Sequence, residues 1–445
     1  MQHLGVTYRY KFMRSFYFLL SFLFFSNITF CQDSLSYTDS FLKNFYRQDL
    51  VRSTLDFSLG TSGGIGSFDR IRPGREVRNR SSLIGSYTNF YNRPKLQQTI
   101  TTFLSSNVSG ETSFSFDNNG EVTSSDFRFG SLLSTSSASF RFYRKSNWYV
   151  EVSPSLFISY SDASDLSHSL FALGGNLVGF GKGRVELVSD AWSALRIIED
   201  LKQAGVIRQD LNYEEYWEFA ELLADLNNLR RLDARMKRVF ELTEIGTYLI
   251  DKGIVNSEDI AFMAQLSDTY ENERFVPRQS GSRWLVFGEV LASRRTTASI
   301  DSRTSSNFSG GFNYFYHNPI KQRWQLDLIG GIRFERDPFF DSFTDISPDL
   351  ALGANATGTL GYYPNARTNV DFSVQANYSN LFSDDFIFDI DPFNLTAAID
   401  GVYFLSPYTS FNARLVYRTD NTGGFLFSPS DRKLGFQFGV SHSFF

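Results

Sequence analysis

The stretch RWQLDLIGGIRFER, Arg323 to Arg336, places an apolar side chain at nearly every second position. In an extended chain, alternate side chains point to opposite faces. One face would therefore carry Trp324, Leu326, Leu328, Ile332 and Phe334, and the other would carry Arg323, Asp327, Arg333 and Glu335. This pattern predicts a β-strand with one apolar face and one charged face.

The same alternation recurs along most of the chain after residue 50, for example in residues 369–378 and 411–418. No candidate strand is the continuous apolar run that parallel sheets require, so we predict antiparallel pairing. The predicted strands number about fourteen. They cover residues 53–61, 78–91, 95–116, 127–144, 147–161, 166–178, 282–299, 304–317, 320–336, 348–364, 367–382, 391–406, 407–419 and 432–445.

The breaks between these strands alternate in length. Short breaks such as Asn318-Pro319 and Pro364-Asn365-Ala366 separate longer polar ones such as residues 337–349. Alternating short turns and long loops are typical of bacterial outer-membrane barrels, where the turns lie in the periplasm. Aromatic side chains near the short turns predict a girdle at the membrane interface; they are Tyr91, Trp148, Tyr149, Tyr316, Trp324, Tyr362, Tyr363 and Tyr408.

The composition agrees with an aromatic-rich, weakly acidic membrane protein. The chain has 445 residues, 47 of them Phe and 22 Tyr, yet its formal net charge is only −5 and its mean hydropathy is −0.23. The rings are interleaved with polar residues, so apolar surface is spread along many strands. Because no long basic run is present, nucleic acid is a poor candidate partner.

The N-terminal residues have the order of a secretory signal. Arg9, Lys11 and Arg14 precede an apolar run from Phe16 to Phe25, which is shorter than the roughly 20 residues of a membrane-spanning helix. We expect residues 1–31 to be a signal peptide, followed by an N-terminal periplasmic segment at 32–52. Cys31 is the one cysteine of the chain. It is either removed with the signal peptide or lipidated instead.

A helical island interrupts the strands between two barrel halves, which we predict at residues 53–180 and 281–445. Within the insertion, 181–280, Ser189 is the expected N-cap of a first helix, and Gly205 its stop. A second helix is expected from Asn212 towards Gly253, broken near Asn227-Asn228, and a third after Ser257. Counting strands from the C-terminus places the island in the periplasm or folded from there into the lumen.

The C-terminal residues alternate in the same way, with Leu434, Phe436, Phe438, Val440 and Phe444 on one face. This ending resembles the aromatic-ended last strand of outer-membrane proteins. The whole chain resembles outer-membrane β-barrel proteins of Gram-negative bacteria, in a Tyr/Asn/Phe-rich style similar to that of the Bacteroidota, but it resembles no specific characterised family. The resemblance implies an outer-membrane location, and outer-membrane lipid, lipopolysaccharide and the barrel-assembly machinery as partners.

The polar face of the strands carries the candidate functional residues. Lumen-facing candidates are Lys321, Arg323, Asp327, Arg333, Glu335, Asp371, Arg414 and Arg418. They either line a polar passage or pair with one another and fill the interior. We therefore hold two hypotheses: a pore or facilitator for a small solute, and a membrane-anchored structural or docking protein whose periplasmic helices bind an envelope partner.

Other polar groups give weaker signals. In the island, Arg230, Arg231, Asp233 and Arg235 are candidates for binding a periplasmic protein or other envelope partner, or for pairing within the helices. Two acidic loop clusters, at residues 337–349 and 384–391, lack a known calcium-binding spacing, so we predict no metal site. With four histidines in the chain, none in a convincing nucleophile–base pattern, we expect no catalysis and no cofactor.

Overall fold

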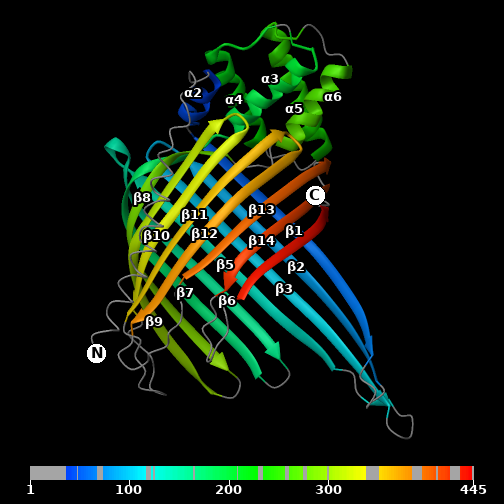
Figure 1. Ribbon diagram of the computed structural model, residues 1–445, viewed down its shortest axis with the longest axis vertical. Coiled ribbons are helices and arrows are strands. Elements are labelled where there is room, and N and C mark those ends of the chain that lie inside the picture. The colour runs from blue at the N-terminus through cyan, green and yellow to red at the C-terminus, as the bar shows by residue number, and fades with distance from the viewer. Residues whose placement is uncertain are drawn as a thin grey trace.

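The computed structural model shows one long antiparallel sheet with a cluster of helices at one end (Figure 1). It describes residues 37–442, except residues 48, 68–73, 117–121, 124–125, 164–165, 208, 229–233, 256–259, 274–277, 298–299, 337–349, 383–392, 407–408 and 421–430. The signal-peptide prediction and Cys31 therefore lie outside the described residues.

Fourteen long strands follow one another in the sheet in the order of the sequence, and each pairs antiparallel with the next. Before the helical insertion, the long strands are β1 (Leu50–Ser67), β2 (Gly74–Asn92), β3 (Leu96–Phe116), β5 (Asp126–Tyr143), β6 (Trp148–Ala163) and β7 (Leu166–Leu187). An additional two-residue strand, β4 (Val122–Thr123), pairs only with β3. The remaining eight are β8 (Gln279–Thr297), β9 (Ile300–Lys321), β10 (Trp324–Arg336), β11 (Leu350–Asn365), β12 (Thr368–Phe382), β13 (Phe393–Ser406), β14 (Thr409–Asp420) and β15 (Asp431–His442).

The predicted fold class is an all-β transmembrane antiparallel β-barrel of about fourteen strands with an α-helical periplasmic insertion. The antiparallel sheet of fourteen long strands and the helical insertion are confirmed. The register follows from the alternation, because a shift of one residue would exchange the two faces of a strand. In β10, for example, Leu328 pairs with Tyr316 of β9 and Gly358 of β11. β1 and β15 are the two edges of the sheet.

Five helices lie at the end of the sheet that carries the short turns (Figure 1). They are α2 (Tyr37–Asn44), α3 (Ser189–Gln203), α4 (Tyr213–Asn228), α5 (Ala234–Asp251) and α6 (Ile260–Glu273), and we call them together the helical domain. No helix among the described residues is long and apolar enough to cross a membrane.

The helix boundaries confirm most of the sequence signals. Gly205 and Gly253 have positive φ values of 72° and 71° and follow the ends of α3 and α5. Asn212 and Glu215 exchange side-chain to backbone hydrogen bonds at the start of α4, a capping box. The prediction for Ser189 is wrong: Val188 is the N-cap of α3. The Ser189 hydroxyl instead accepts a hydrogen bond from the Arg278 amide at 2.9 Å.

The helical domain has its own hydrophobic core. Trp192, Leu195 and Ile198 of α3 pack with Phe219 of α4 and Phe262 of α6, all of them at most 2% exposed. Segment 37–44, which precedes the first strand, belongs to this core as well, through Phe41 and Leu42. The insertion and the N-terminal segment therefore fold together, although strands β1 to β7 separate them in sequence.

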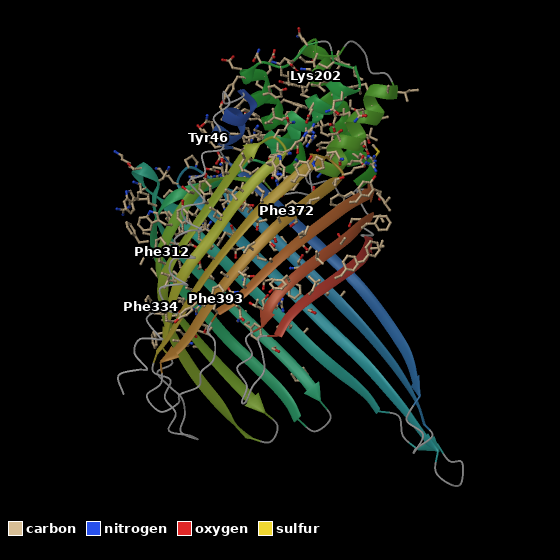
Figure 2. All side chains as sticks on the ribbon, in the orientation of Figure 1. Tyr46, Lys202, Phe312, Phe334, Phe372 and Phe393 are labelled. Atoms are coloured by element: carbon tan, nitrogen blue, oxygen red, sulfur yellow. The ribbon has the colours of Figure 1, made fainter. Side chains whose placement is uncertain are left out.

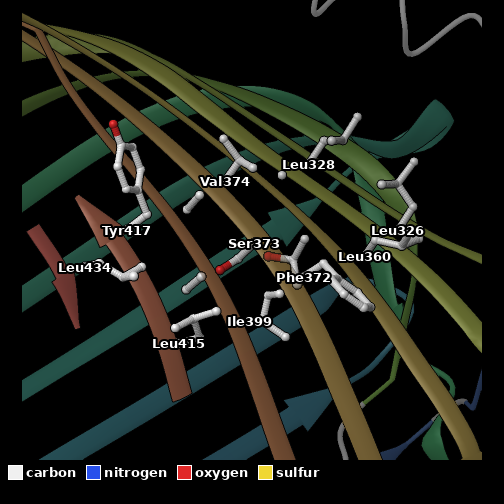
Figure 3. Close-up of a pocket in the computed structure, with 14 residues that line it drawn as sticks. Leu326, Leu328, Leu360, Phe372, Ser373, Val374, Ile399, Leu415, Tyr417 and Leu434 are labelled. Carbon is white, nitrogen blue, oxygen red and sulfur yellow. The ribbon is translucent and has the colours of Figure 1, made fainter. Parts of the chain in front are cut away.

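The outer face of the sheet is strongly apolar across β10 to β15. Figure 2 shows Phe312, Phe334, Phe372 and Phe393 on the strands, and Lys202 beyond their end on the helical domain. A shallow apolar hollow crosses six strands, β10 to β15, and is lined by Leu326, Leu328, Phe372, Ile399, Leu415 and Leu434 among others (Figure 3). A surface of this extent and composition suits hydrocarbon tails.

Among the described residues, which exclude Tyr408, the aromatic girdle is smaller than the sequence predicted. Trp148 stacks on Phe180 at 4.9 Å between ring centroids, and Trp324 lies 4.4 Å from Tyr362, so these rings do lie on the outer face near the short turns. The girdle prediction is wrong for Tyr149 and Tyr363, which point inward and are 1% and 7% exposed. Each follows an outward-facing aromatic residue by one position, and adjacent strand residues face opposite sides.

Candidate functional site

The end of the β7–β8 pair leaves the wall of the sheet and bends inward. It crosses the end of the sheet that carries the short turns, which we call the mouth. Two strands, β5 and β6, separate β7 from β3 in the sheet. The end of β7 nevertheless touches the β2–β3 turn: Arg184 donates to Asn92 Oδ1 at 2.7 Å, and Gln97 donates to the Val185 carbonyl at 2.9 Å. Because neighbouring strands lie about 4.8 Å apart, this contact requires the ribbon to leave the wall and cross the interior.

Glycines make the bend in both strands. Gly183 of β7 and Gly281 of β8 have φ values of 104° and 113°, a region that L side chains rarely adopt. They lie two positions apart in the β7–β8 register, where Gly183 pairs with Arg283 and Gly281 with Val185. The pairing of β7 with β8 continues to Leu187, so the bend is inward and keeps its hydrogen bonds.

Helix α3 continues from this ribbon and spans the mouth. Near its first turn, Asp190 accepts two hydrogen bonds from one Arg52 nitrogen, at 2.8 and 2.9 Å, and so joins α3 to β1. Near its last turn, Glu199 accepts a hydrogen bond at 2.6 Å from Arg323, in the β9–β10 turn. Nine residues of α-helix cover about 13.5 Å. Because β1 and β10 lie far apart in the strand order, α3 bridges two walls of the sheet.

Further contacts fix the helical domain over the mouth. Arg367, in the β11–β12 turn, forms an ion pair with Asp268 of α6. Arg196 of α3 donates to the Tyr363 carbonyl at 2.7 Å, and the Arg278 guanidinium lies over the Tyr363 ring and, at 4.4 Å from its centroid, the Trp192 ring. We call the β7–β8 ribbon beyond Gly183 and Gly281, together with the helical domain, the cap.

Beneath the cap, the β5–β8 wall carries a buried charged network. Glu151 of β6 accepts hydrogen bonds from Arg141 of β5 at 2.9 Å and from Arg283 of β8 at 3.3 Å. Ser139 and Ser153 also donate to this carboxylate. All three charged side chains are at most 13% exposed. Two guanidinium groups thus share one carboxylate, which leaves this wall with an excess of positive charge.

The remaining inner face carries carboxylates paired with basic side chains. His317 lies 2.8 Å from Asp327, Arg333 binds Glu289 at 3.0 Å, and Arg414 lies 3.3 Å from Asp400. On β12, Asp371 accepts a hydrogen bond from the Tyr363 hydroxyl at 3.0 Å. The inner face of these strands therefore carries charged and polar groups, in contrast to the apolar outer face of β10 to β15.

The structure distributes the sequence-predicted lumen residues over two kinds of position. Asp327, Arg333, Glu335 and Asp371 lie on the strand face opposite to Trp324 and Leu326, and Arg414 and Arg418 lie on the corresponding face of β14. Arg323 does not lie on the strand where the sequence analysis places it. It occupies the two-residue turn after β9 rather than a strand, so its guanidinium reaches Glu199 of the cap. Lys321 ends β9 at the rim and is exposed.

The predicted partner-binding group is only partly described. Arg230, Arg231 and Asp233 lie outside the described residues. Arg235 is the second residue of α5, and its side chain also lies outside them. The two acidic loop clusters likewise fall outside the described ranges. Within the described ranges, no group of three or more His, Cys, Asp or Glu side chains is arranged to hold a metal ion.

Several residues of the site were missed by the sequence analysis. Arg141 and Glu151 show a usable signal, because each follows an outward-facing aromatic or aliphatic residue in a strand. Arg52 and Asp190 show none: one lies at the start of β1 and the other in a helix, and only the fold brings them together. Gly183 and Gly281 also gave no signal, since a glycine in a strand does not reveal the direction of a bend.

Comparison with known proteins identifies solved structures that resemble the chain but no family. No family model matches the chain, and no curated protein matches it. Solved structures that resemble it include the outer-membrane channel DcaP of Acinetobacter baumannii, 8% identical over 89% of this chain and 99% of that one, with a TM-score of 0.28. The anion-selective porin from Comamonas acidovorans is 8% identical over 88% of this chain and 100% of that one, with a TM-score of 0.28.

A third similar structure is the translocator domain of the autotransporter NalP from Neisseria meningitidis, 10% identical over 91% of this chain and 92% of that one, with a TM-score of 0.24. TM-scores this low do not indicate a shared function. The chain's own architecture consists of long antiparallel strands with an apolar outer face, interfacial aromatic rings and short turns at one end. This architecture places the protein in the outer membrane of a Gram-negative bacterium.

Proposed function

We propose that the protein is an outer-membrane pore for a small solute and that the cap controls access to its periplasmic mouth. The observation that carries the proposal is an unfilled cavity of about 440 Å³ beneath the cap, lined by residues of β1, β2, β3, β5, β7, β8, β9 and β10. A barrel that served only as an anchor would gain stability by filling this space with side chains.

The contacts of the cap support a gating role. Three charged pairs join the cap to the rim of the sheet: Arg52–Asp190, Arg323–Glu199 and Arg367–Asp268. The Arg323–Glu199 and Arg367–Asp268 pairs are partly exposed, and such ion pairs contribute little free energy each and depend on salt. Such a cap can detach without disturbing the hydrogen bonds of the sheet.

Single-channel recording in planar bilayers tests the proposal. The full chain is compared with a variant in which all three acidic partners are neutralised, Asp190→Asn, Glu199→Gln and Asp268→Asn. We expect few openings from the wild type and longer or larger openings from the triple variant. A matched control, Glu214→Gln with Glu244→Gln, removes two exposed charges of the helical domain that have no role at the rim and should behave like the wild type.

Complete silence of both the wild type and the triple variant, with folding verified by heat-dependent electrophoretic mobility, would contradict a pore. That outcome would favour the docking hypothesis, in which the helices bind an envelope partner and the barrel is only an anchor.

A further inference from the structure

The cavity beneath the cap has an uneven charge distribution. Its lining includes three arginines, Arg52, Arg141 and Arg283, together with His317. Among the described residues that line it, none carries a carboxylate. The carboxylates that pair with the three arginines, Asp190 and Glu151, are not part of the lining, and neither is Asp327, which lies 2.8 Å from His317.

Neutral hydrogen-bonding groups complete the polar side of the cavity. They are Gln97, Gln279, Thr54, Thr88 and Thr99. The Arg141 guanidinium also donates to Gln97 Oε1 at 3.2 Å, which holds the two side chains in one orientation. A set of fixed guanidinium groups and neutral donors matches the oxygens of a carboxylate or phosphate.

Apolar side chains form the rest of the lining. Phe90, Phe315 and Ile329 face the same space, and the Arg283 guanidinium lies 4.1 Å from the Phe315 ring centroid. Stacking on a ring removes one face of the guanidinium from water and leaves its edge, which carries the N–H donors, directed away from the ring. The cavity therefore combines anion-binding donors with an apolar surface, and its volume suits a small organic molecule rather than a bare inorganic ion.

We propose that this cavity binds a small organic anion, a carboxylate or phosphate ester, on its way through the pore. The assignment rests on the proposed function, since it names the solute class for the same passage. Arg141 and Arg283, which share Glu151, supply the excess positive charge. Arg52 links the site to the cap, because the same guanidinium lines the cavity and binds Asp190 of α3.

Equilibrium binding to the full chain in detergent tests the proposal separately from conductance. Isothermal titration is performed with citrate as the anionic probe and with glucose as the neutral probe. We expect citrate to bind at low ionic strength and glucose not to bind. Arg283→Gln should weaken citrate binding roughly 10-fold to 100-fold, the effect of losing a charge-assisted contact.

A second variant keeps the Arg141–Glu151–Arg283 network intact in case Arg283→Gln does not fold. Thr88→Glu places a carboxylate in the lining, and we expect it to abolish citrate binding by repulsion and by pairing with the arginines. Gln375→Glu adds the same charge on the inner face of β12, outside the lining, and should leave binding within about 2-fold of the wild type.

Absence of citrate binding to the folded wild type would overturn the proposal, as would binding that Thr88→Glu leaves unchanged. Either result together with clear channel openings would leave the pore standing and reject only the anion site. Citrate binding in a protein that never conducts would reject the pore and retain the site.

Discussion

Arg52 of β1 and Asp190 of α3 lie 138 positions apart in the sequence, yet one arginine nitrogen reaches both carboxylate oxygens at 2.8 and 2.9 Å. The carboxylate is 2% exposed and the guanidinium 24% exposed. Asn227 of α4 also donates to this carboxylate at 2.9 Å. The pair therefore joins the first strand of the sheet to two helices of the cap.

Asp190→Asn should loosen the cap without changing the shape of the side chain. The amide oxygen can still accept the hydrogen bond of Asn227, so the variant mainly removes the charge that Arg52 faces. Breaking a largely buried pair leaves an uncompensated charge, and because Arg52 is partly exposed we expect a loss on the order of 2 kcal/mol in the free energy of unfolding of the helices. Thermal unfolding followed by circular dichroism at 222 nm measures it.

An exposed pair of the same helix provides the control for this prediction. Lys202 and Asp210 form an ion pair with side chains that are 60% and 52% exposed. Lys202→Ala should change the stability by less than about 1 kcal/mol. Equal effects of Asp190→Asn and Lys202→Ala would show that the Arg52–Asp190 pair does not hold the cap.

The inward bend of the β7–β8 ribbon makes a second prediction. Gly281→Ala would put a Cβ against the Arg184 carbonyl oxygen at a φ of 113°. A side chain at such a backbone angle costs about 1–3 kcal/mol, and the clash adds to it. We expect the ribbon to detach from the β2–β3 turn, which limited proteolysis would detect as faster cleavage within residues 188–278.

Gly288→Ala is the matched control for the bend, because it lies on the same strand and an added Cβ meets nothing within 4 Å. Its cleavage rate should equal that of the wild type. If Gly281→Ala is cleaved no faster than Gly288→Ala, the bend does not depend on glycine.

The strands were predictable from the sequence because one physical rule dominates them. Alternation in Trp324–Phe334 and in residues 369–378 fixes which face each residue occupies, and turns between strands fix the pairing. The helices α3 and α4 were predictable from Gly205 and Asn212, whose capping roles are local.

The arrangement of the cap was not predictable in this way. The contacts Arg52–Asp190 and Arg323–Glu199 join segments more than a hundred residues apart, and no local pattern relates them. Likewise, alternation assigns Arg141 and Arg283 to the inner face but does not reveal that they share Glu151. The site depends on how the strands curve and how the ribbon bends, which are properties of the whole sheet.

The two faces of β10 allow a direct comparison at adjacent positions. Leu328 lies on the outer apolar face and Ile329 lines the cavity inside. Leu328→Arg places a charge against hydrocarbon and should cost about 2–4 kcal/mol near the membrane midplane. Ile329→Arg places the same side chain in a polar interior and should cost clearly less, although it would disturb the cavity. Urea unfolding in lipid vesicles measures both variants, and a larger loss for Ile329→Arg would reverse the assignment of the faces.

The helical domain should also respond to pH through Asp200 of α3. Burial raises the pKa of this carboxyl above its usual range, and the hydrogen bond from the Thr269 hydroxyl at 2.8 Å only partly offsets the shift. A folded-state pKa above the unfolded value means that folding favours the protonated form. The cost of burying the charge is therefore present at neutral pH and is relieved as the pH falls through the folded-state pKa.

Asp200→Asn should consequently stabilise the helices at pH 7, because the amide oxygen keeps the Thr269 hydrogen bond and carries no charge. The gain should shrink as the pH falls towards the usual range of an aspartate, where the wild-type carboxyl is protonated too. Melting temperatures at 222 nm, recorded for both proteins between pH 4 and pH 7, measure the difference. A variant that melts below the wild type at pH 7, or a gap that grows as the pH falls, would mean that the Asp200 carboxylate stabilises the cap in its charged form.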